Sequence, residues 1–107
     1  MKSYTDIEQS KRLAEILPLE SADMYYDVNS YGVQTTPEVL ITSVIRKKDV
    51  PCWSLAALLD VLPSFTLDSS NDHYYMLHCM GQITGWHENP IDACYEMIIG
   101  LHGLKML

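Results

Sequence analysis

The sequence predicts a single α+β domain, spanning residues 1–107, in which three helices pack on one face of a mainly antiparallel sheet of four or five strands. The first supporting observation is the length of 107 residues, which fits one compact domain. The second is a hydrophobic share of 48%, which is sufficient for a core. The third is the element order α-β-(β)-α-β-β-β-α, in which helical apolar spacing alternates with short β-branched or aromatic segments.

The first helix is expected over residues 5–17. Thr5 is the expected N-cap, and Glu8 lies three positions later, which is the spacing of a capping box. Apolar residues recur on one face of this segment, and Pro18 is expected to end it. A short strand is expected over 23–28, where adjacent tyrosines and a valine precede a turn-rich stretch.

The stretch 36–50 allows two interpretations. Thr36 followed by Pro37 is typical of a helix start, because proline is tolerated in the first helical turn. A cluster of β-branched residues over 39–45 favours a strand instead. We interpret the segment as a strand, and the helix stays open over 36–48.

The second helix, over 54–62, has the clearest pattern. Ser54 is the expected N-cap, and Trp53 is placed to pack against the fourth helical residue as a hydrophobic staple. Pro63 is expected to end the helix. The apolar stripe consists of four leucines at helical spacing: Leu55, Leu58, Leu59 and Leu62.

The last part of the chain predicts an antiparallel meander followed by a helix. The three expected strands are separated by short turn-rich connectors. The final helix is expected over 90–104, with Asn89 as N-cap, Pro90 in the first turn and Asp92 near the free amides. The expected strands cover residues 65–68, 73–80 and 82–87.

Charge and targeting signals restrict the partners. Fourteen acidic and seven basic residues give a net charge of −7, which disfavours direct binding to nucleic acid or to an anionic membrane. No apolar run reaches the roughly 20 residues that span a bilayer, and residues 1–17 do not resemble a signal peptide. Three widely spaced cysteines are typical of reduced thiols. We therefore expect a cytoplasmic protein.

No motif predicts catalysis, a metal site or a cofactor. His87-Glu88 begins like the helical zinc-protease motif, but the second histidine is absent and Pro90 places the helix start after His87. Cys52 precedes a helix start, where a thiolate would be stabilised, although a small buried core residue is the better account. We accordingly expect no catalytic, cofactor-binding or metal-binding residue.

Paired aromatic residues predict an interaction surface. The seven tyrosines include two adjacent pairs on expected strands, where side chains alternate between faces. Tyrosine, tryptophan and methionine are enriched at protein interfaces. The alternative is that one ring of each pair packs in the core. The leading hypothesis is a non-enzymatic interaction protein whose unknown protein partner could be a second copy, with a contact surface containing Tyr25, Tyr26, Tyr74 and Tyr75.

Two other functions stay open. A small-molecule-binding protein or enzyme would need a cleft in which at least two polar side chains converge within about 3–4 Å of one point. An acidic mimic of nucleic acid would need clustered carboxylates, whereas the acidic residues here are dispersed along the chain. The residues expected to line the cleft are Trp53, His73, His78 and Trp86.

Two segments carry a resemblance to known proteins. Residues 51–63 read PCWSLAALLDVLP, residues 88–97 read ENPIDACYEM, and Trp86 precedes the second segment. Together they resemble small uncharacterised proteins of phages, prophages and mobile elements of gut Bacteroidales. The resemblance covers residues 51 to about 104. It implies a mobile-element accessory factor and the same α+β order, and it assigns no activity or site residue.

Overall fold

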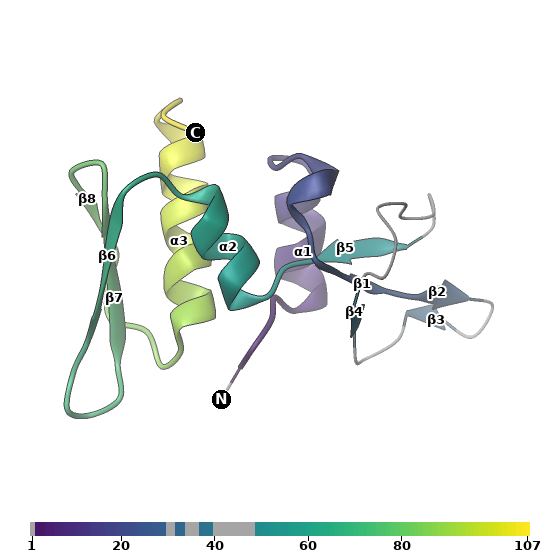
Figure 1. Cartoon of the computed structure of the whole chain (residues 1–107), viewed down its shortest axis with the longest axis horizontal. Helices are drawn as coiled ribbons and strands as arrows, with labels where there is room; N and C mark the ends of the chain where they lie inside the picture. Colours follow the sequence, from purple (N-terminus) through teal and green to yellow (C-terminus); the bar gives the residue numbers. More distant parts are fainter. Residues whose placement is uncertain (1, 30–31, 34–36, 40–48) are drawn as a thin grey trace.

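The computed structural model describes residues 2–29, 32–33, 37–39 and 49–107 (Figure 1). The predicted α+β class is confirmed. Within the described residues the helices are α1 (Ile7–Ala14), α2 (Leu55–Val61) and α3 (Pro90–Gly103), with one 3-10 turn at Leu19–Ser21. The described strands are β1 (Met24–Tyr26), β2 (Val28–Asn29), β3 (Gly32–Val33), β4 (Glu38–Val39), β5 (Val50–Cys52), β6 (Phe65–Ser69), β7 (Tyr75–Cys79) and β8 (Gln82–Ile83).

The sheet arrangement differs from the expected single sheet. The described strands form a β4-β1-β5 sheet, a β2-β3 pair and a β6-β7-β8 sheet, and all pairs are antiparallel. The helices lie between the sheet of β4, β1 and β5 and the sheet of β6, β7 and β8 (Figure 1). α1 contacts β5, whereas α3 contacts β7 and β8. The strands that precede α2 in the sequence pair only with one another, and so do the strands that follow it. The helices therefore do not pack on one shared sheet face.

In the ambiguous stretch 36–50, three of the five described residues are strand: Glu38, Val39 and Val50. β4 and the first residue of β5 belong to it, and both strands pair with β1. Residues 40–48 lie outside the described part of the chain. The strand interpretation is therefore supported at the two ends of the segment only.

α1 covers Ile7–Ala14 instead of the expected 5–17, and its N-cap lies one residue later than expected. Asp6 is the N-cap, and it forms a capping box with Gln9 in place of Thr5 with Glu8. The Gln9 amide donates to Asp6 Oδ1 at 2.8 Å, and the Asp6 amide donates to Gln9 Oε1 at 3.1 Å. Both pairs have the required spacing. Thr5 is buried and bonded to the β5 region, which leaves Asp6 for the cap.

The caps of α2 and α3 are as predicted. Ser54 Oγ accepts from the Ala57 amide, and Asn89 Oδ1 accepts from the Asp92 amide. Asp23 adds a contact that ties β1 to α2, because its carboxylate accepts from both the amide and the hydroxyl of Ser54.

The core lies between the helices and β7. Its fully buried side chains come from all three helices, from β7 and from Trp53 between β5 and α2. The three cysteines are free and buried. None of the described helices is long and apolar enough to cross a membrane. The largest core residues are Leu13, Trp53, Leu58, Leu77, Ile91, Ile98 and Leu101.

Candidate functional site

The four predicted tyrosines do not form one surface. Tyr25 and Tyr26 belong to β1, whereas Tyr75 begins β7 in a different sheet, with Tyr74 just before it. Tyr26 is only 2% exposed, and Tyr25 donates its hydroxyl to Glu38 Oε2 at 2.7 Å across the β1–β4 pair. Tyr74 is exposed and Tyr75 is half-buried. The alternative of one packed and one outward ring therefore describes the Tyr25–Tyr26 pair.

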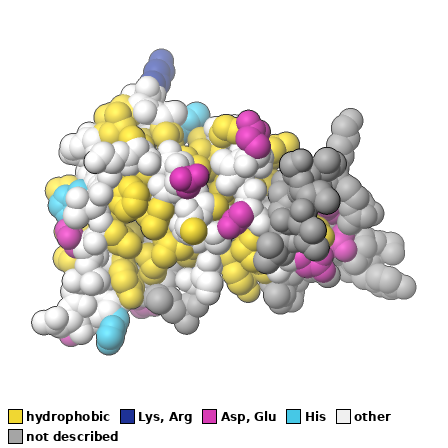
Figure 2. Space-filling view, viewed as in Figure 1, with side chains coloured by type: hydrophobic (Ala, Val, Ile, Leu, Met, Phe, Trp, Pro, Cys, Tyr) yellow, Lys and Arg dark blue, Asp and Glu magenta, His cyan; other side chains and the backbone are white. Residues whose placement is uncertain are grey.

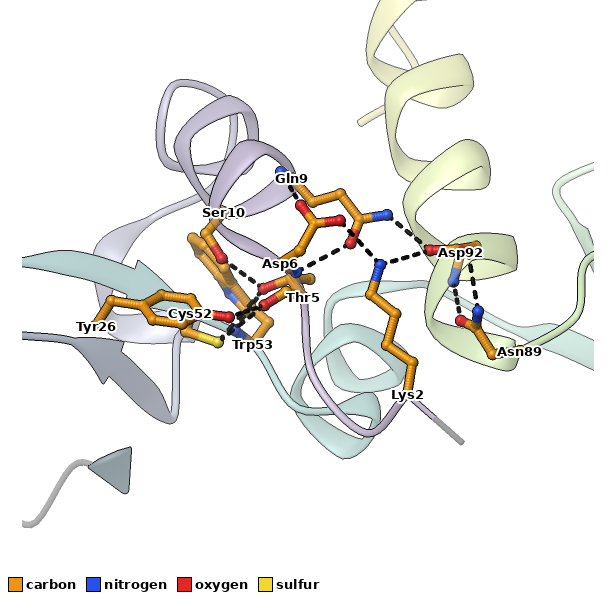
Figure 3. A network of polar contacts seen from close by, with 10 residues as sticks. All are labelled: Lys2, Thr5, Asp6, Gln9, Ser10, Tyr26, Cys52, Trp53, Asn89 and Asp92. Carbon is orange, nitrogen blue, oxygen red and sulfur yellow. Dashed lines mark hydrogen bonds and ion pairs between the residues drawn. The ribbon is translucent and has the colours of Figure 1, made fainter. Parts of the chain in front are cut away.

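Tyr26 belongs to a buried network that docks the N-terminal segment onto β5 (Figure 3). Its hydroxyl donates to the Thr5 carbonyl at 2.7 Å, and the Thr5 hydroxyl accepts from the Trp53 amide at 3.1 Å. The Thr5 hydroxyl also lies 2.7 Å from that of Ser10. Burial raises the pKa of Tyr26 well above its ordinary value. These buried residues therefore stabilise the fold and are not accessible to a partner.

The predicted cleft is not assembled from its four residues. Trp53 is fully buried, and its indole nitrogen donates to Ser21 Oγ at 3.0 Å. His73 lies in the turn before β7 and lines a groove with Lys2. His78 and Trp86 are near or in the β6-β7-β8 sheet, away from that groove's lining. A side chain sealed in the core, such as Trp53, lines no open cleft.

A polar network centred on Asp92 joins the N-terminal segment to α3 (Figure 3). Lys2 Nζ lies 2.9 Å from Asp92 Oδ1, and Gln9 Nε2 donates to the same oxygen at 2.8 Å. Asn89 Nδ2 donates to the other oxygen at 2.9 Å. Partial burial alone would raise the pKa of Asp92, but the bonds from Lys2, Gln9 and Asn89 outweigh it and hold the pKa below its ordinary value.

Two grooves flank this network. The larger has a volume of about 460 Å³, and its lining includes Lys2, His87, Asp92, Tyr95, Glu96 and Ile99. The other has a volume of about 420 Å³ and is lined by Lys2, His73, Tyr75, Glu88 and Asn89. In the larger groove the His87 imidazole pairs with the Glu96 carboxylate. The charged side chains of the larger groove thus bond to one another, and neither lining contains a thiol or a serine hydroxyl.

The cysteines are not activated for nucleophilic chemistry. Burial raises the pKa of Cys52 and Cys79 above the ordinary value, and it raises the pKa of Cys94 to about 12. A nucleophilic cysteine needs the opposite shift. Within the described residues, no group of three or more His, Cys, Asp or Glu side chains is arranged to hold a metal ion. The larger groove contains one imidazole–carboxylate pair, His87 with Glu96.

The β6-β7-β8 sheet has one covered and one open face. Leu77 and Cys79 of β7 are buried on the face that contacts α3, so their neighbour His78 points to the other face. Figure 1 shows α3 on one side of this sheet and no described element on the other. Cross-strand register and side-chain alternation define the open side, here called the outer face: Thr66, Asp68, Met76, His78, Ile83 and Trp86.

Exposed hydrophobic side chains gather on this sheet. Eight large hydrophobic residues in the described chain are exposed, and five of them fall between residues 65 and 86. Ile83 and Trp86 are 63% and 51% exposed on the outer face. His78 Nε2 lies 3.0 Å from Asp68 Oδ2 beside them. The other three are Phe65, Tyr74 and Met80.

Of the eight residues singled out by the sequence, the outer face contains His78 and Trp86, with Tyr74 adjoining it at the start of β7. Ile83 and Met76 were missed, because an apolar residue in a short strand looks like a core residue. Met76 could have been identified, because it is next to the buried Leu77 on β7 and neighbouring side chains on a strand point to opposite faces. A scan of protein-family models and searches of curated proteins and of solved structures found no match for this chain.

Proposed function

We propose that this protein is a non-enzymatic interaction protein that binds a protein partner through the outer face of the β6-β7-β8 sheet. The observation that carries the proposal is the exposure of two large hydrophobic residues, Ile83 and Trp86, on one open sheet face that also contains the half-buried Met76. Scattered single apolar residues are normal on a protein surface, whereas a contiguous group is typical of an interaction site. Tryptophan and methionine are also among the residues enriched at interfaces.

Charge supports a protein partner over nucleic acid. The net charge of −7 opposes the approach of phosphate backbones. On the outer face Asp68 is the one acidic side chain and lies 3.0 Å from His78, and the other four residues, Thr66, Met76, Ile83 and Trp86, have no charged group. Depletion of charge at the centre is typical of protein interfaces.

The setting of this function is part of the proposal. The resemblance over residues 51 to about 104 suggests an accessory factor of phage or mobile-element type, and it is the only support for that origin. Three buried free thiols fit a reducing compartment such as the cytoplasm. A mobile-element protein that binds a host or phage protein would need no catalytic group.

The proposal is tested by affinity capture from cells that produce the protein. The wild-type chain should retain a defined set of proteins, and the double variant Ile83→Ser with Trp86→Ala should lose at least one. Both residues are exposed, so the variant is expected to fold with little change in stability.

The matched control is Leu19→Ser in the 3-10 turn. Leu19 is 51% exposed, as is Trp86, but it lies outside the β6-β7-β8 sheet. This control should capture the same proteins as the wild type. Equal capture by all three chains, or no specific capture by the wild type, would refute the assignment of the outer face.

A further inference from the structure

The β6 edge of the sheet is open in the described chain. The strand order is β6-β7-β8, so β6 pairs on one side only among the described strands. β6 has five residues, whereas β8 at the other edge has two. A strand edge with unpaired backbone groups is a template for pairing with another strand. Natural proteins often protect such edges with lysine or proline, and Phe65–Ser69 contains neither.

Backbone hydrogen bonds show which residues of β7 face each neighbour. Tyr75 exchanges backbone bonds of 2.7 and 2.8 Å with His87, and the Leu77 carbonyl accepts from the Thr84 amide at 3.0 Å. Tyr75 and Leu77 therefore direct their backbone groups toward the β8 side. In an antiparallel ladder the direction alternates along the strand, so the residues between them face β6.

The same alternation identifies the free groups of β6. The residues of β7 that face β6 are Met76 and His78, and their partners across the pair are Asp68 and Thr66. The Ser70 amide donates to the Tyr74 carbonyl at 2.8 Å, two positions along from the Asp68–Met76 pair, as this alternation requires. The remaining residues of β6 consequently direct their N–H and C=O groups to the open edge. These residues are Phe65, Leu67 and Ser69.

We propose that a second copy of this chain pairs with this edge through its own β6, antiparallel and centred on Leu67. In this register Leu67 of each copy is hydrogen-bonded to Leu67 of the other, and Phe65 is hydrogen-bonded to Ser69. All three residues have their backbone groups aimed outward, so the two edges are complementary along their whole length. The product is one continuous sheet of six strands, and both outer faces stay open.

Side-chain chemistry favours this register. It places Thr66 of one copy opposite Asp68 of the other, where the hydroxyl can donate to the carboxylate. A parallel, in-register pair would instead place the two Asp68 carboxylates side by side, and like charges in that position are destabilising. The polar residues of β6 therefore select a second copy in the antiparallel direction.

Burial of apolar surface also favours pairing of the two β6 edges. Phe65 is 38% exposed, and Leu67 packs only partly against the core. Figure 2 shows hydrophobic side chains gathered over the region where this sheet, α2 and α3 meet. Pairing of two edges would bring both copies of Leu67 together beside that region and remove apolar surface from water. The inference goes beyond the proposed function, because the pairing uses the backbone groups of β6 at the sheet edge, whereas the proposed partner contacts the exposed side chains Ile83 and Trp86 on the β8 side of the outer face.

Sedimentation equilibrium of the full chain tests the pairing. The wild type should show a monomer–dimer equilibrium. Thr66→Asp should weaken the dimer by about tenfold, because two symmetry-related pairs become repulsive, and Thr66→Lys should strengthen it by a similar factor. Adding Asp68→Asn to Thr66→Lys should cancel the gain. Thr66 is exposed, so circular dichroism should show that each variant keeps the wild-type fold.

The matched controls place the same charges on the opposite edge. Gln82 is exposed on β8, and Gln82→Glu and Gln82→Lys should leave the dimer constant unchanged. A wild-type chain that stays monomeric at all concentrations would overturn the proposal, as would equal effects at positions 66 and 82. The outer-face variant Ile83→Ser with Trp86→Ala should still dimerise, so failure of the dimer and failure of the proposed function are distinguishable.

Discussion

Asp92 has a different role in the structure from the one that its sequence position suggests. Its spacing from Glu96 and its place near a helix start suggest a solvated carboxylate that complements the helix dipole. In the structure, Asp92 accepts from Lys2, Gln9 and Asn89, and so joins α3 to the N-terminal segment. Sequence spacing could not show this, because Lys2 and Asp92 are 90 residues apart.

The lowered pKa of Asp92 predicts a pH-dependent stability. A carboxyl with a lowered folded-state pKa stabilises the fold fully above its ordinary value of 3.8, and this contribution is lost as the pH falls below that value. Asp92→Asn should therefore reduce the free energy of unfolding by about 1 kcal/mol at pH 7. The difference from the wild type should shrink as the pH is lowered from 5 to 2.

Urea unfolding at a series of pH values measures this difference. Asp60→Asn, on the exposed side of α2, is the control and should show no comparable pH-dependent change. A gap between Asp92→Asn and wild type that stays constant down to pH 2 would contradict the assigned network.

The buried thiols predict low reactivity. Burial raises the pKa of all three cysteines, so little thiolate is present at pH 8 and reagents have poor access. We expect no fast reaction with a thiol-specific disulfide reagent in the native state, and complete reaction in denaturant. Gln82→Cys, which creates an exposed thiol, should react at once. Rapid native reaction of the wild type would show that a cysteine is open to solvent.

At the scale of elements, the contact between the N-terminal segment and β5 depends on Thr5. The Trp53 amide is buried and donates to the Thr5 hydroxyl at 3.1 Å. Thr5→Val keeps the side-chain shape but leaves that amide without this acceptor, so it should cost about 1–3 kcal/mol. Thr66→Val, at an exposed site on β6, should change stability by less than about 0.5 kcal/mol.

Chemical denaturation at a single low protein concentration compares the two valine variants. The low concentration keeps self-association from contributing. A loss for Thr5→Val no larger than that for Thr66→Val would show that the buried hydroxyl does not hold the N-terminal segment in place.

Local elements could be predicted better than their assembly. Ser54, Asn89 and the leucine stripe of α2 carry strong local signals, because caps and helical periodicity depend on neighbours within a few residues. The choice between Thr5 and Asp6 as the cap of α1 depended on the distant Trp53 amide. The division of the strands into separate sheets depended on pairings across the chain, which apolar patterns do not specify.

The candidate site shows the same limit. Alternation along β7 could separate the buried Leu77 from its outward neighbours, so Met76 and His78, two of the six outer-face residues, were accessible from the sequence. The exposure of Trp86 and the burial of Trp53 could not be distinguished, because both tryptophans lie just before a helix. Packing against the core decided their roles.

For the whole molecule, the arrangement places the proposed contact surface at one end. The chain extends 42 × 31 × 21 Å, with the helices between two sheets (Figure 1). The open face of the β6-β7-β8 sheet therefore points away from the rest of the domain. A partner could cover this face without contact with the N-terminal network or with the grooves beside Asp92.

The most direct test of the outer face as a protein-binding surface is site-specific photocrosslinking in cells that produce the protein. A photoreactive amino acid at position 83 should give a discrete crosslinked species that contains a second protein. The same group at position 19, which is similarly exposed on the 3-10 turn, should not. No discrete product at position 83, or the same product at both positions, would contradict the account.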